Sequence, residues 1–334
     1  MRSLVRYAYG NARMRAFVSR LLDERTYERL LSAKDAPSFL EALRGTACEG
    51  MPLESFSREC LRQAEEWLRQ REHEEIENVV AGYPAGRERD VLQYVVEEEN
   101  LGELKTALRV WRETRETGRA PALSAPERFQ GLAQCADREC LLRSSALKEY
   151  FTEEEDAAHL PWFVIEARLD REFLGAMMRR VARLAPSDRT AAGKILGIEI
   201  DRRNLRLIGR ALRFYPDRRQ ELFGFLCSGG LVLTDEVIGQ LRASASPEEV
   251  LARVNRPYGN LAQIVRLPSE EMERAVDVFL LAQVRRALAG YPFSIGGPLG
   301  FVILRRRQTA RLGRILAEKV GQAEGERARS GAAC

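Results

Sequence analysis

Residues 195–212, ILGIEIDRRNLRLIGRAL, contain the pattern that decides the fold class. Charged side chains fill the gaps between apolar ones, and Pro216 follows where a helix is expected to end. The apolar positions follow the period of an α-helix and form one stripe: Ile195, Ile200, Leu205, Ile208 and Leu212. This stretch predicts an amphipathic helix with a buried face.

Similar stripes recur along the chain and predict further helices. They lie at 56–68, 91–111, 162–184, 272–288 and 304–316. Sustained alternation of apolar and polar residues, the pattern of a half-buried strand, is not found between turn signals. We therefore expect an all-α protein.

Glycine and proline gather between these helical segments, at 118–126, 215–230 and 290–298. The breaks predict three helical lobes: 1–118, 119–215 and 216–334, the last with the final long helix. A search for internal repeats supports this division, because a short motif returns once in each segment.

The repeated motif is Asn-Leu or Arg-Leu within a helix. It reads NLGEL at 100–104, NLRLI at 204–208 and RLGRI at 311–315. Asparagine is a poor residue for a helix interior, so its return suggests a repeated polar contact between packed helices. We expect Asn100 and Asn204 to be mostly buried and hydrogen-bonded to neighbouring helices, with Leu101, Leu205 and Leu312 in the core.

The composition is that of a globular chain and excludes several classes of protein. Among the 334 residues, 45% are hydrophobic and 31% charged, which excludes wholesale disorder. The net charge of +4 argues against a nucleic-acid-binding protein, which needs a basic stripe. The longest apolar runs, 222–226 and 301–304, are far shorter than the roughly 20 residues of a membrane helix. Without a signal peptide or CxxC pair, we expect a cytoplasmic chain with free thiols.

The patterns of catalytic, cofactor and metal sites are missing from the sequence. His73 and His159 are the only histidines, and neither has a second metal ligand one helical turn away. Residues 192–194, AGK, lack the spacing of a phosphate loop, so we expect no direct nucleotide binding. We find no nucleophile–base pair and expect no enzymatic activity. The triplet at 305–307, RRR, has two interpretations: a contact with anionic lipid or an acidic partner, or a solvated helix face.

Several motifs together resemble the family of C-type subunits of V-type ATPases and ATP synthases, whose eukaryotic members are known as the d subunit. Residues 9–15, YGNARMR, resemble its start, and 98–101, EENL, with 199–206, EIDRRNLR, resemble its recurring helix motif. Residues 292–299, PFSIGGPL, resemble the loop before its last long helix. The chain departs from the family at Arg311, where asparagine is usual, at Arg305-Arg306, where the family has Lys-Glu, and at Cys48, where tyrosine is common.

The resemblance implies a fold and a role. Three similar lobes would surround a pseudo-threefold axis and form a funnel with a central cavity. A protein of this kind is a non-catalytic rotor adaptor on the cytoplasmic face of the membrane. It links the central stalk, with subunits of the D and F type, to the proteolipid ring, and its membrane association is indirect. It transmits torque between ATP turnover and ion transport.

The resemblance also marks candidate residues for contacts with partners or between lobes. They are Asn11, Arg13, Arg15, Asn100, Asn204 and Arg206. Three other classes of protein remain as alternatives. The main one is a helical-repeat scaffold or regulatory binding protein unrelated to ATPases; a nucleic-acid-binding protein and an enzyme are weaker.

Overall fold

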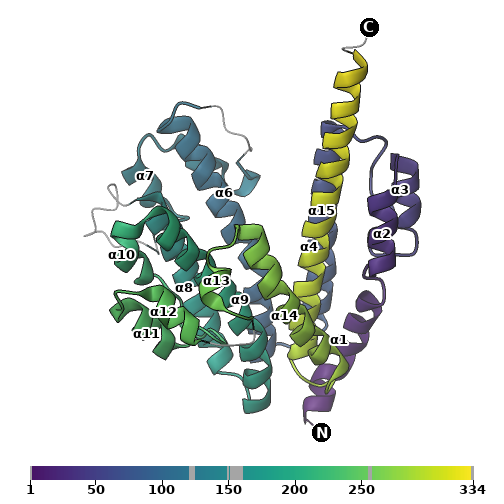
Figure 1. Cartoon of the computed structure of the whole chain (residues 1–334). Coiled ribbons are helices and arrows are strands. Elements are labelled where there is room, and N and C mark those ends of the chain that lie inside the picture. The colour runs from purple at the N-terminus through teal and green to yellow at the C-terminus, as the bar shows by residue number, and fades with distance from the viewer. Residues whose placement is uncertain (1, 120–124, 149, 151–160, 255–257, 332–334) are drawn as a thin grey trace. The chain divides into compact units, whose positions relative to one another are not determined.

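The computed structural model describes residues 2–119, 125–148, 150, 161–254 and 258–331. His159 lies outside these residues. The described chain forms α-helices and two short 3-10 helices, with no β-strand, which confirms the predicted all-α fold (Figure 1).

The chain divides into two compact units. The first unit comprises Met1–Leu92 and Gln283–Cys334, and the second comprises Gln93–Ala282. The three lobes with breaks at 118 and 215, and the pseudo-threefold funnel, therefore stay predictions.

The first unit contains the two ends of the chain. Its helices are α1 (Arg2–Val18), α2 (Glu24–Ser32), α3 (Ala36–Ala42), α4 (Arg58–Ala81) and α15 (Gly296–Gly331). Two further helices, α5 (Arg87–Val96) and α14 (Ser269–Ala289), contain the points where one unit ends and the other begins.

The second unit holds the remaining helices, most of them short. They are α6 (Glu98–Arg115), η1 (Glu127–Gln134), α7 (Arg138–Leu142), α8 (Trp162–Ala182), α9 (Pro186–Phe214), η3 (Pro216–Arg218), α10 (Arg219–Phe223), α11 (Asp235–Ala243), α12 (Pro247–Arg253) and α13 (Leu261–Ile264). The stripe at 91–111, expected as one helix, is divided at Glu97, where the bond from Leu101 N to Glu97 O lengthens to 3.4 Å.

Helix ends follow from local side chains. Asp23 accepts a hydrogen bond from Thr26 N at 2.8 Å and begins α2, and Ser57 accepts one from Cys60 N at 3.3 Å and begins α4. Each cap satisfies a backbone N–H that the first helical turn leaves unpaired. After α6 the chain reaches Gly118 with φ +63°, a left-handed conformation that favours glycine.

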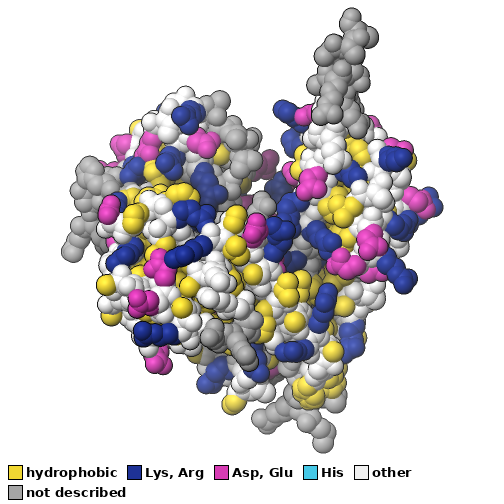
Figure 2. All heavy atoms as spheres, viewed as in Figure 1, with side chains coloured by type: hydrophobic (Ala, Val, Ile, Leu, Met, Phe, Trp, Pro, Cys, Tyr) yellow, Lys and Arg dark blue, Asp and Glu magenta, His cyan; other side chains and the backbone are white. Residues whose placement is uncertain are grey.

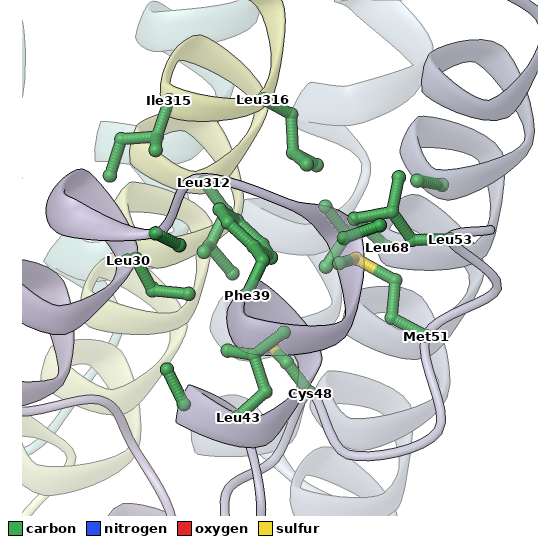
Figure 3. Close-up of a cluster of buried hydrophobic side chains, with 14 of the residues drawn as sticks. Leu30, Phe39, Leu43, Cys48, Met51, Leu53, Leu68, Leu312, Ile315 and Leu316 are labelled. Atoms are coloured by element: carbon green, nitrogen blue, oxygen red, sulfur yellow. The ribbon is translucent and has the colours of Figure 1, made fainter. Parts of the chain in front are cut away.

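The core of the first unit forms where short helices cover the long pair α4 and α15. α15 packs along α4, and α1 contacts both (Figure 1). Leu30, Phe39, Leu68 and Leu312 are 0–1% exposed and converge from α2, α3, α4 and α15 (Figure 3). Burying one such side chain contributes roughly 1.5–3 kcal/mol. The predicted core position of Leu312 is confirmed.

The second unit is built around α9. This helix packs against α8 and α10, while α6 packs against η1 and α8. Leu205 of α9 is 0% exposed and Leu101 of α6 is 6% exposed. Both were predicted to be core residues from the repeated motif, and both predictions are confirmed.

Candidate partner-contact and interlobe residues

Asn11 lies inside the first unit. Its side-chain amide donates to the carbonyl oxygen of Pro292 and accepts a hydrogen bond of 3.0 Å from the hydroxyl of Tyr83. Burial raises the pKa of Tyr83, so this hydroxyl stays a donor. A Cβ on Gly10 would lie 2.7 Å from the Tyr83 ring, which explains the glycine of the opening motif. Asn11 therefore joins α1 to two loops, which is a bracing contact.

The two arginines of the opening motif have different environments. Arg13 is half-buried, and its Nη2 donates to the side-chain oxygen of Asn78 on α4 at 2.8 Å. Arg15, two positions further along α1, is exposed. Within the first unit, Arg13 thus braces α1 against α4, and whether Arg15 contacts a partner stays a prediction.

Asn204 makes the buried contact that the repeated motif predicts. It is 1% exposed, donates to Cys227 O at 2.9 Å and accepts from Cys227 N at 2.8 Å. One amide side chain thereby satisfies both main-chain groups of a residue in the loop after α10.

Asn100 does not occupy an equivalent environment. It is half-buried and accepts a hydrogen bond from the guanidinium of Arg128 on η1. The expected hydrogen bond to a neighbouring helix is present, but the expectation that Asn100 and Asn204 occupy equivalent positions was wrong, since Asn204 is fully buried and bonds main-chain groups.

Arg206 pairs with a carboxylate at the surface of the second unit. Its guanidinium contacts Glu273 of α14, and its side chain is 42% exposed. The neighbouring Arg203 pairs with Glu98 and lies 3.6 Å from Asp170. These ion pairs hold α9 to α6, α8 and α14 within the same unit.

Asp201 is an organising residue that the sequence did not reveal. It is 0% exposed and accepts hydrogen bonds from Val232 N, Leu233 N and the Tyr258 hydroxyl at 2.7–2.9 Å. Burial raises its pKa to about 6, although these three bonds oppose the rise. A Cβ on Gly230 would lie 2.3 Å from the Asp201 carboxylate, so the loop needs glycine there. In the sequence, the position of Asp201 directly after Ile200 of the apolar stripe was the one sign that this aspartate is buried.

Arg305, the first residue of the triplet at 305–307, fits neither of the two interpretations given to the triplet. It is 0% exposed, and its Nε donates to the Glu75 carboxylate on α4 at 2.6 Å. Its Nη1 donates to Thr309 at 2.8 Å. Arg305 is therefore an interior link between α15 and α4; neither lipid contact nor a solvated face describes it.

Two further residues of α15, Gln308 and Arg311, contact the N-terminal part of the first unit. Gln308 accepts from Leu22 N at 2.8 Å and donates to the sulfur of Cys48 at 3.4 Å. Arg311 donates to both oxygens of Glu24 at 2.9 and 3.0 Å and lies 3.6 Å from the centre of the Tyr27 ring. Arg311 thus makes a charged contact between α15 and α2.

The described residues contain no group of three or more histidine, cysteine, aspartate or glutamate side chains that could hold a metal ion. Within the same residues, no helix is both long and apolar enough to cross a membrane. On the face drawn in Figure 2, basic and acidic side chains are interspersed.

Comparison with models of known protein families gives a match to this chain. The family model described as ATP synthase (C/AC39) subunit matches residues 10–328, which include most of both compact units. The comparison with curated proteins found no match. Because the family match covers nearly the whole chain, the protein belongs to the V-type ATP synthase C/AC39 subunit family.

Proposed function

We propose that this chain is the non-catalytic rotor adaptor of a V-type ATPase or ATP synthase. It joins the central stalk, with its D-type and F-type subunits, to the proteolipid ring on the cytoplasmic side of the membrane. The observation that carries the proposal is the family match over residues 10–328. Family membership implies association with other subunits of the complex and leaves no reason to keep the unrelated scaffold as an alternative.

The packing of the first unit supports a role in transmitting torque. A rotor part must pass on force without bending, and closely packed interiors transmit strain. α15 and α4 lie along each other and are joined internally by Arg305 and Glu75. Catalysis and nucleotide binding belong to other subunits in this proposal.

A bridging experiment tests the proposal. Detergent-solubilised proteolipid ring is immobilised and incubated with the purified stalk heterodimer, with and without this chain. We expect the stalk to be retained on the ring only when the chain is present. Equal retention without the chain, or none with it, would refute the adaptor function.

A further inference from the structure

An arginine-lined groove of about 380 Å³ lies within the second unit. It is formed by the last two turns of α6 and the residues after it, the first part of α8 and the last part of α9. Its lining residues are Arg109, Arg112, Glu113, Thr117, Arg119, Glu166 and Arg210. Four arginines against two glutamates leave the groove positively charged.

Glu166 organises one side of the groove. Arg109 donates to its two carboxylate oxygens at 3.0 and 3.2 Å, and Arg210 lies 3.9 Å away. Burial raises the pKa of Glu166, but the bond from Arg109 and the surrounding positive charges outweigh it, and the pKa lies below its ordinary value. The ionised glutamate therefore holds the Arg109 guanidinium by two hydrogen bonds and attracts that of Arg210.

The other two arginines are exposed and have spare hydrogen-bonding capacity. Neither Arg112 nor Arg119 forms an ion pair with a carboxylate among the described residues. Arg112 lies 6.0 Å from the centre of the Trp162 ring, at the outer limit of a cation–π contact. Each guanidinium can still donate a pair of parallel hydrogen bonds to a carboxylate.

The surroundings favour separate carboxylates over a compact phosphate group. The groove lies at the C-terminal ends of α6 and α9, where the helix dipole places partial negative charge. Glu113 and Glu166 add two negative charges, and the lining contains no glycine-rich loop to cradle phosphate with main-chain N–H groups. A protein segment whose acidic residues are spaced apart brings less negative charge to any one point of the groove than a phosphate group does, so it is repelled less.

We propose that this groove binds an acidic segment of the central stalk, with carboxylates paired to Arg112 and Arg119. The inference rests on the proposed adaptor function and adds to it a contact surface and the chemistry of the partner. Arg109, Glu166 and Arg210 form the wall against which the segment lies.

The test compares two variants that carry the same change in charge. Arg112→Glu/Arg119→Glu reverses the two available groove arginines, and Arg143→Glu/Arg253→Glu reverses two exposed arginines of the same unit outside the groove. Affinity for the purified stalk heterodimer is measured by calorimetry, after thermal melting has confirmed that both variants fold. We expect at least about tenfold weaker binding for the groove variant and a change within about twofold for the control.

The outcomes distinguish a failure of the inference about the groove from a failure of the proposed adaptor function. Wild-type binding with an unchanged groove variant overturns the inference and leaves the adaptor function standing. A wild-type chain that does not bind the stalk contradicts both. Direct calorimetric binding of micromolar tripolyphosphate to the wild-type chain, lost in the groove variant while that variant still binds the stalk normally, identifies a phosphate site and also overturns the inference.

Discussion

α15 of the first unit and α9 of the second carry copies of the same motif but hold their neighbours by different chemistry. On α15, Arg305 and Arg311 reach carboxylate side chains on α4 and α2. On α9, Asp201 and Asn204 bond main-chain groups in the loop that follows α10. At these four positions, α15 uses charge pairs with side chains, whereas α9 uses hydrogen bonds to the main chain.

The difference teaches which contacts can tolerate sequence change. Every residue except proline has both a main-chain N–H and a C=O group, so Asn204 can make the same two hydrogen bonds with any residue but proline at 227. Arg305 is fully buried and the Glu75 carboxylate balances its charge, so these two positions must change together. Arg311 and Glu24 are 37% and 68% exposed, and water can replace either partner.

Glu75→Ala is expected to have the largest effect, because it leaves the fully buried Arg305 without its carboxylate. We expect a loss of about 3–5 kcal/mol in the free energy of unfolding, measured by urea denaturation. Glu66→Ala on the same helix removes an exposed partner of Arg69 and should cost less than about 1 kcal/mol. The double change Glu75→Leu/Arg305→Met should restore most of the loss. Equal effects of the two alanine variants would show that the buried pair is not needed.

Leu205→Ala tests the apolar side of the repeated motif. Leu205 is fully buried, so truncation should lower the free energy of unfolding by about 2–5 kcal/mol. The half-buried Leu207 on the same helix serves as the control, and Leu207→Ala should cost clearly less. A thermal midpoint unchanged by Leu205→Ala would contradict the core assignment.

The raised pKa of Asp201 predicts that the stability of the second unit depends on pH. Its pKa is about 6 in the folded chain and 3.8 in the reference state, so folding favours the protonated carboxyl. Its stabilising contribution is complete below pH 3.8 and is lost as the pH rises through 6. The difference in unfolding free energy between wild type and Asp201→Asn should therefore fall by about 2 kcal/mol between about pH 4 and pH 7. A difference that stays constant or rises over this range would refute the assignment.

The smallest effects are expected at Asn204 and Arg311, the first residues of the motif on α9 and α15. Asn204→Ala leaves the main-chain groups of Cys227 unpaired inside the protein and should cost about 1–3 kcal/mol. Arg311→Ala removes a partly exposed ion pair and should cost less than about 1 kcal/mol. If calorimetric melting ranks the two variants in the opposite order, the distinction between backbone recognition and surface charge fails.

The sequence predicted the apolar framework well, because helical periodicity is a local property. The stripe on α9 and the buried Leu101, Leu205 and Leu312 can be read from residues a few positions apart. The polar contacts were harder to predict. Asn204 behaved as expected, whereas the burial of Asn100 did not follow from its motif.

Residues paired across long sequence distances were beyond prediction from the sequence. Arg305 lies in a basic triplet that suggests a surface, and its carboxylate partner is 230 residues away. Asp201 is bonded by a loop about thirty residues further along, through main-chain groups that leave no residue signature. The arginine groove likewise collects side chains from three helices that are separate in sequence.

The most direct test of the account measures coupling in vesicles. A complex lacking this chain is reconstituted with its proteolipid ring, and ATP hydrolysis and membrane potential are followed together before and after the chain is added. We predict that hydrolysis proceeds without the chain but builds no potential, and that adding the chain restores the potential. A full potential in the absence of the chain would contradict its role as the link between stalk and ring.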